Sequence, residues 1–397
     1  MAIVNTVASG YFVLDTPDIR WNDAAQGRMV VVTIAPLNGI PVTFTEQYTP
    51  DDNHAVTLRG LSALLQPYVS PCPTSSATFR TLLTNSGAWI ATLSRAQWTA
   101  TLYQANGTTR VGDALTSYAY YASQRTSTRP GLSAIWLSRY TSRDIVPSQP
   151  LIGCFMMMSG VTARLRVYYN DGQGVLHETV VTPSLNGAVA TDPPSQAVVL
   201  HYTLSALASA ISSIENTIID KDNIVQVDFE LLEGNSVADT LRYRIDREHK
   251  KMLRLLAFTN CFGMLETEAF VGSEEEDTVL DAEFSYLDEN YEKISQQLVG
   301  SSRLCAGHVN DERRRSIRDI ATSPEVYLIR RDGSSCFEQM TVTDMELKDQ
   351  RPHTTFQTAF VTLRPSHRHQ ETVSRGQSIS QEESDGVFDY TFDDSFN

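Results

Sequence analysis

Residues 161–181 read VTARLRVYYNDGQGVLHETVV and carry the pattern that decides the fold. Apolar residues recur at every second position from Val161 to Tyr169, while the positions between them are mostly polar. This period of two is typical of a half-buried strand. The Asp171-Gly172 step that follows favours a tight turn, and VLHETVV returns as a second strand. The stretch therefore predicts an antiparallel hairpin.

The same alternation predicts two further hairpins, at residues 28–48 (RMVVVTIA, PLNG, IPVTFTEQY) and 224–245. In the strand 224–232 we expect Val225, Val227, Phe229 and Leu231 to face a core and Gln226, Asp228 and Glu230 to face solvent. Half-buried antiparallel strands build sandwiches and small barrels. The predicted fold class is therefore mainly β, with multidomain antiparallel β-sandwich or barrel modules and a few short helices.

Three stretches are candidates for helices. Residues 203–219 align an apolar stripe at helical spacing, which consists of Leu204, Leu207, Ile211, Ile214 and Ile218. Residues 310–322 form a short helix that Asn310 or Asp311 caps and that stops before Pro324. Residues 285–298 show a weaker helical pattern.

Composition shifts divide the chain into four parts. Residues 1–145 are expected to form an N-terminal β domain with an insertion around 71–130, and residues 146–245 a β-sandwich domain. Residues 246–366 are expected to form a C-terminal β-rich domain that holds the short helix. Residues 367–397 are acidic and poor in large apolar residues over most of their length, so we expect a disordered tail.

Charge and cysteine usage exclude several classes of protein. The chain has 397 residues and a formal net charge of −15, whereas nucleic-acid binders normally present a basic surface. No apolar run is long enough to span a membrane, and the first residues lack the features of a signal peptide. The five cysteines have no paired spacing, so we expect free buried thiols. Neither nucleic acid nor membrane is an expected partner.

A search for catalytic and metal-binding motifs predicts no enzyme, no cofactor and no metal site. The chain lacks a G-x-S-x-G elbow, a P-loop and a G-x-G-x-x-G motif. His367 and His369 could share a metal ion, but no third ligand accompanies them. The acidic run 273–283 lacks the ligand spacing of a calcium loop, and we interpret it as a solvated loop.

Residues 258–272, FTNCFGMLETEAFVG, read as two strands that meet at Gly263. We expect the chain to turn there, or another backbone to approach closely. Apolar neighbours make Cys261 an inert buried thiol, and Phe258, Phe262 and Phe270 are expected to hold the hairpin in a core. Glu266 and Glu268 share a strand face, which is compatible with paired carboxylate catalysis but more often occurs as exposed carboxylates.

Four stretches together resemble tail structural proteins of Bacteroidetes phages and prophages, of the distal-tail or baseplate kind. They are FTNCFGMLETEAFVG (258–272), AIWLSRYTSRDIVPSQPLIGCFMM (134–157), SPEVYLIRRDGSSCFEQMTVTDMELK (323–348) and the terminal FDYTFDDSFN. The family has an apolar residue or Trp before the Glu of the first stretch, where this chain has Met264 and Leu265. The resemblance covers about half of the chain, mostly after residue 134.

The resemblance implies β-sandwich modules in a tail-tip or baseplate ring, with interaction surfaces and no active site. The partners would then be other virion tail proteins and further copies of the chain in a homo-oligomeric ring. The protein would be located in the virion and assembled in the cytoplasm of the bacterial host. Phe388, Tyr390 and Phe392 alternate with polar residues, mostly acids, and are the candidate interaction residues, which could add a strand to a neighbouring sheet. A purely solubilising acidic tail is the competing interpretation.

Two other functions stay open. The first is a glycan-binding, adhesin-like module on the virion surface, in which Trp89, Trp98 or Trp136 would offer stacking surfaces unless they pack in a core. The second is a hydrolase with an unrecognised site, which would use Glu266 or Glu268.

Overall fold

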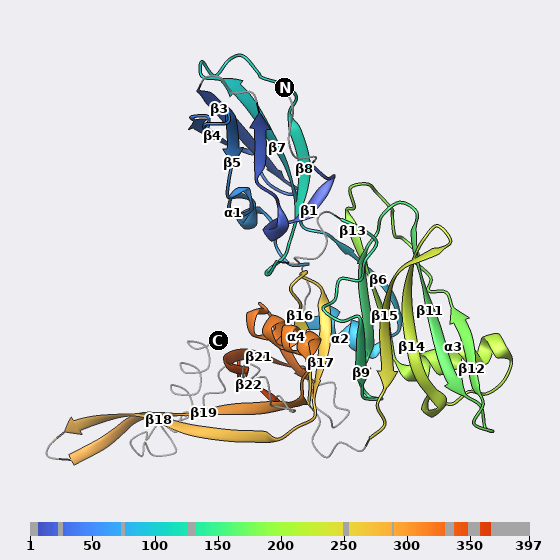
Figure 1. Cartoon of the computed structure of the whole chain (residues 1–397). Coiled ribbons are helices and arrows are strands. Elements are labelled where there is room, and N and C mark those ends of the chain that lie inside the picture. Colours follow the sequence, from blue (N-terminus) through green and yellow to red (C-terminus); the bar gives the residue numbers. More distant parts are fainter. Residues whose placement is uncertain are drawn as a thin grey trace, which may run out of the picture.

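The computed structural model describes residues 7–22, 27–72, 76–125, 132–248, 254–287, 290–329, 337–347 and 358–366. Strands dominate this part of the chain and form five sheets, with a few short helices between them (Figure 1). The predicted mainly β class is confirmed. Among the described residues, no helix is both long and apolar enough to cross a membrane.

The first module is a five-stranded sheet with a small two-stranded sheet beside it. Its strands, in sheet order, are β1 (Gly10–Phe12), β8 (Leu115–Tyr120), β7 (Arg95–Gln104), β3 (Arg28–Pro36) and β4 (Val42–Tyr48). The second sheet pairs β2 (Ile19–Asn22) with β5 (Ala55–Leu58), and the short helices are η1 (Val13–Asp15), α1 (Leu61–Leu65) and η2 (Gln66–Tyr68). The predicted hairpin 28–48 is confirmed as β3 and β4.

The stretch 71–130 is not an insertion in this module. Its strands β7 and β8 are the inner strands that join β1 to β3. Its other elements, α2 (Ser76–Thr84) and β6 (Gly87–Thr92), belong to the next module, because β6 pairs with a strand from residues 196–202. The sequence did not reveal that β6 belongs to the middle module, because β6 and the strand that it pairs with lie about 100 residues apart along the chain.

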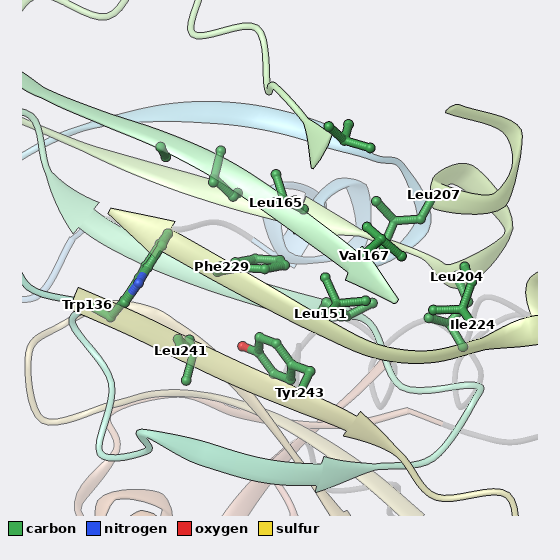
Figure 2. Close-up of a cluster of buried hydrophobic side chains, with 14 of the residues drawn as sticks. Trp136, Leu151, Leu165, Val167, Leu204, Leu207, Ile224, Phe229, Leu241 and Tyr243 are labelled. Atoms are coloured by element: carbon green, nitrogen blue, oxygen red, sulfur yellow. The ribbon is translucent and has the colours of Figure 1, made fainter. Parts of the chain in front are cut away.

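The middle module is a β-sandwich. One sheet has the order β12 (Leu176–Val181), β11 (Val161–Asn170), β14 (Ile224–Glu233), β15 (Ser236–Ile245) and β9 (Ser142–Ile145). The other has the order β10 (Leu151–Met156), β13 (Gln196–Tyr202) and β6. Side chains of both sheets and of α3 (Leu204–Glu215) fill one core, in which Trp136 packs against Phe229 and α3 contributes Leu204 and Leu207 (Figure 2). A short turn of helix, η3 (Lys221–Asn223), precedes β14.

The predicted hairpins of this module are confirmed. Val225, expected in the core, is only half-buried, because the pairing of β11 with β14 skips it at a bulge and places Ile224 in the core instead. Asp228 and Glu230, expected in solvent, are only 3% and 7% exposed. They do lie on the outer sheet face, but arginines of the neighbouring strands cover and pair with them. On α3 the stripe stops early, since Ile214 is 51% exposed and Ile218 lies beyond the helix end.

The third module is a seven-stranded sheet that α4 (Asp311–Thr322) covers, which confirms the helix predicted at 310–322. The sheet order is β17 (Leu265–Phe270), β16 (Arg254–Thr259), β20 (Val326–Ile329), β21 (Phe337–Leu347), β22 (Thr358–Pro365), β19 (Asn290–His308) and β18 (Glu274–Leu287). Two predictions are wrong here, because the acidic run 273–283 lies largely in β18 and the stretch 285–298 is strand rather than helix. The tail 367–397 lies outside the described residues.

The hairpin of β18 and β19 projects away from the rest of the protein (Figure 1). Its two strands pair from Glu274 and Leu304 to Leu287 and Asn290. The neighbouring strand β22 pairs with β19 only between Ser302 and His308. Beyond that point the hairpin is a two-stranded ribbon, with no further strand beside it in the part of the chain that the structure describes. We call residues 277–301 the arm.

Candidate functional site

The two glutamates of β17 lie in a buried polar network at the junction of the middle and third modules. Both were expected to be exposed, yet each is only 4% exposed. They are buried because the segment 138–143, which leads into β9, packs against β17 and supplies donors to them. Two adjacent modules are therefore joined through ionised and hydrogen-bonding side chains.

Glu266 accepts three hydrogen bonds. Its Oε1 accepts from Ser138 Oγ at 2.8 Å and from Arg143 at 3.1 Å, and its Oε2 accepts from Asn260 Nδ2 at 2.9 Å. Burial raises the pKa of Glu266, and the positive charge of Arg143 offsets this rise only in part. Both carboxylate oxygens are thus engaged by the chain itself.

Glu268 also accepts three hydrogen bonds, two from α4 and one from Tyr140. Its Oε1 accepts from Arg313 Nε at 2.9 Å, and its Oε2 accepts from Tyr140 Oη at 2.6 Å and from Ser316 Oγ at 3.3 Å. Burial, and then the negative charge of Glu268, raise the pKa of Tyr140 far above its usual value. Tyr140 therefore stays protonated and acts as a hydrogen-bond donor, not as a base.

Arg143 is the cation at the centre of the network. It donates to Glu266 and to the carbonyl of Thr267. Its guanidinium also lies 4.6 Å from the ring centroid of Tyr140, which is within the range of a cation–π contact. A rigid planar donor that bonds in two directions suits a buried pair better than a lysine would.

Asp319 of α4 extends the network to the turn between β16 and β17. Its Oδ2 accepts from the backbone N–H of Cys261 at 3.0 Å and from Arg139 Nε at 3.4 Å. Burial is the main cause that raises the pKa of Asp319, and burial also raises that of the Cys261 thiol. Cys261 is therefore an inert buried thiol, as the sequence predicts.

The turn 260–263 is where the first module joins the other two. Gly263 has a φ of +77°, and a Cβ there would lie 2.7 Å from Tyr121 Cδ1 and 2.9 Å from Pro71 Cα. Its carbonyl accepts from the backbone N–H of Cys72 at 3.0 Å. The sequence predicted a turn or a close backbone approach at Gly263, and both occur. The predicted core positions of Phe258, Phe262 and Phe270 are also confirmed.

A polar cavity of about 470 Å³ borders this network. Tyr140, Arg143, Glu268 and Arg313 form part of its wall, together with His308. Both carboxylate oxygens of Glu266 and of Glu268 already accept hydrogen bonds from the chain. Neither glutamate is therefore placed to take a proton from a substrate. Among the described residues, no group of three or more His, Cys, Asp or Glu side chains could hold a metal ion.

The tryptophans of the glycan-binding alternative lie elsewhere. Trp98 is 0% and Trp136 4% exposed, so both are core residues and offer no stacking surface. Trp89 is partly buried and packs against a second core cluster. The four cysteines in the described part of the chain are buried and free. The candidate interaction residues Phe388, Tyr390 and Phe392, and the pair His367 and His369, lie outside the described residues.

Sequence reasoning missed the residues that complete the network, namely Tyr140, Arg143, Arg313 and Asp319. One signal was present. In α4, Ser316 lies three residues before Asp319 and four before Ile320, so it shares a helix face with each of them, and Asp319 borders the apolar stripe. A charged residue on an apolar stripe indicates a buried ion pair, although its partner cannot be named from the sequence.

Comparisons with known proteins add little. No protein-family model matches the chain, and no curated protein matches it. Among solved structures, the chain is similar to the "tetra-tandem repeat in extending region of large adhesion protein", with 11% identity and a TM-score of 0.18. That match covers 89% of this chain and 86% of the other. A TM-score this low carries no argument about fold or function.

Proposed function

We propose that this chain is a structural component of a phage tail, at the tail tip, the baseplate or a distal-tail ring, and that it acts through protein–protein contacts. Its partners would be other tail proteins and further copies of itself, and its location the virion, after assembly in the cytoplasm of the bacterial host. The observation that carries the proposal is the arm. An isolated two-stranded ribbon is marginally stable in water, so a projecting ribbon is best explained by a partner that packs against it.

The junction between the modules supports the same role. A subunit of a large assembly keeps its shape more readily when its parts are fixed to one another, and a buried polar network in which both glutamates accept hydrogen bonds through both oxygens fixes one arrangement of the parts. The resemblance to tail structural proteins, which was drawn from residues 134–157, 258–272 and 323–348, points in the same direction. Residues 134–157 and 258–272 also contain Tyr140, Arg143, Glu266 and Glu268 of the network.

The virion location is tested by the composition of purified particles. Phage particles from a culture that carries this chain should be separated from free protein by density-gradient centrifugation and analysed by mass spectrometry. The proposal predicts that the chain sediments with the particles in a fixed ratio to the other tail proteins. A chain that is found only in the free-protein fractions would contradict the proposal.

A further inference from the structure

A second cleft, of about 480 Å³, lies where all three modules meet. The first module contributes Phe12, the third contributes Phe262 and α4, and the segment 135–141 of the middle module forms the wall between them. Four arginines line the cleft, namely Arg125, Arg139, Arg315 and Arg318. This is a concentration of positive charge in a chain whose formal net charge is −15.

The four arginines outnumber the two acids that line the cleft, and only one of the four forms an ion pair among the described residues. Arg139 pairs with Asp319, whereas Arg125, Arg315 and Arg318 are exposed and pair with no acid among the described residues. Two acids also line the cleft, and both accept hydrogen bonds from neutral groups of the wall. Glu312 accepts from Thr141 Oγ1 at 2.8 Å, and Asp239 accepts from the backbone N–H of Trp136 at 2.9 Å.

Aromatic rings lie beside the arginines. Phe12 and Phe262 pack edge to face with their centroids 5.2 Å apart, and the Arg139 guanidinium lies 5.8 Å from the Phe262 ring centroid. Arginines bind carboxylates through two parallel hydrogen bonds, and both arginines and phenyl rings pack against aromatic side chains. The chemistry of the cleft therefore matches a peptide that alternates acidic and aromatic residues.

We propose that residues 387–397, VFDYTFDDSFN, bind in this cleft of their own chain. The segment holds Asp389, Asp393 and Asp394 between aromatic residues, and no lysine or arginine follows Arg375. The chain as a whole has a formal net charge of −15, so a cleft rich in arginines is the complementary site for this acidic segment.

The path of the chain favours binding within one molecule. Strand β22, after which the segment follows, packs its Val361 and Leu363 into the same core as Ile317 and Ile320 of α4. Arg315 and Arg318 of that helix line the cleft, and an α-helix is only about 10 Å across. The intervening residues 367–386 can span about 65 Å when extended, so the tether reaches easily. A tether of this length keeps the segment at a high effective concentration.

The test measures how a fluorescently labelled synthetic peptide of residues 387–397 binds to full-length chains, by anisotropy. In the wild-type chain the tethered segment competes with the peptide. The full-length variant Phe388→Ala/Tyr390→Ala/Phe392→Ala should free the cleft and bind the peptide about tenfold more tightly or better. Equal affinity of these two chains would overturn the proposal.

Charge reversal locates the site. Adding Arg315→Glu/Arg318→Glu to the triple-alanine variant should weaken peptide binding about tenfold or more. Adding Arg59→Glu/Arg110→Glu changes the net charge equally at exposed arginines of the first module and should leave the affinity unchanged. Equal losses in the two would show non-specific attraction and overturn the proposal. A wild-type dimer that the triple-alanine change dissociates would also overturn it, in favour of exchange between copies.

Discussion

Arg143 bonds to three parts of the junction at once, through Glu266, the Thr267 carbonyl and the Tyr140 ring. Removing one partner of a buried ion pair leaves the other charge buried and uncompensated, at a cost of about 3–5 kcal/mol. We therefore expect Arg143→Met to lower the free energy of unfolding by about that amount in a urea titration. Arg244→Met is the control, since Arg244 and Asp144 are 59% and 60% exposed and their pair contributes at most about 1 kcal/mol. Equal small losses in both variants would show that the network does not stabilise the fold.

Gly263 and Gly160 form a matched pair of glycines. Both have a φ of +77°, but only a Cβ at Gly263 would meet other atoms, whereas one at Gly160 would meet none within 4 Å. The left-handed conformation alone costs a residue with a side chain about 1–2 kcal/mol, which is the loss expected for Gly160→Ala. Gly263→Ala should cost about 1–3 kcal/mol more, because Pro71 and Tyr121 must move. Equal stability of the two variants in the same titration would refute the close packing of this turn.

Glu266 and Glu230 should contribute to the free energy of unfolding with opposite dependence on pH. Burial raises the pKa of Glu266 above its usual 4.5, so the folded protein holds this proton more tightly than the unfolded chain does. Its contribution to stability is then fully present below pH 4.5 and is lost as the pH rises through the folded pKa. The stability of the wild type relative to Glu266→Gln should therefore fall as the pH is raised from 4.5.

Glu230 is the internal comparison for that experiment. Burial alone would raise its pKa, but hydrogen bonds from Arg166 and Arg164 outweigh burial and lower it. Its contribution is present above pH 4.5 and is lost as the pH falls through the folded pKa. The stability of the wild type relative to Glu230→Gln should thus rise with pH over the acidic range. The same sign for both variants in urea titrations at a series of pH values would contradict these assignments.

At the scale of elements, α4 connects the network to the third module, and its first turn is capped. Asn310 Oδ1 accepts from the backbone N–H of Arg313 at 2.8 Å. Loss of such a cap costs about 1 kcal/mol, so Asn310→Ala should lower the free energy of unfolding by that amount. Asn310→Asp should restore it, because Asp is an equally good cap. Thermal unfolding followed by circular dichroism checks both, and a loss that Asp does not restore would point to a role other than capping.

Most elements could be predicted from the sequence, because period-two alternation is a local signal. It identified the hairpins at 28–48 and 161–181, whereas capping residues and the following proline identified the helix at 310–322. It failed at the acidic run 273–283, where charge density indicated a solvated loop. The run lies in a strand, and arginines of other strands pair with its first two acids, Arg254 with Glu274 and Arg303 with Glu275.

The candidate site was less predictable than the strands around it. Glu266 and Glu268 were recognised as a pair on one face, but their burial depends on Tyr140 and Arg143, which lie more than 120 residues earlier in the chain. Such a pairing is set by how the modules pack, and no local pattern reports it. For the same reason β6 could not be assigned to the middle module.

At the scale of the whole molecule, three modules are fixed to one another while the arm projects from the third (Figure 1). A rigid body with a projecting ribbon suits head-to-tail contacts between identical subunits, which close into a ring when the rotation allows. Assembly should therefore depend on the arm, whereas the stability of the folded chain should not.

The most direct measurement is native mass spectrometry of the full-length chain and of a variant in which Asn-Gly replaces residues 279–299. The replacement joins Thr278 to Gly300, which pair in register, through a two-residue turn that favours hairpins. The full-length chain should form a closed oligomer, and the shortened variant should be a monomer with the same thermal unfolding midpoint. A monomeric full-length chain, or a shortened variant that still forms the same oligomer, would contradict the central claim.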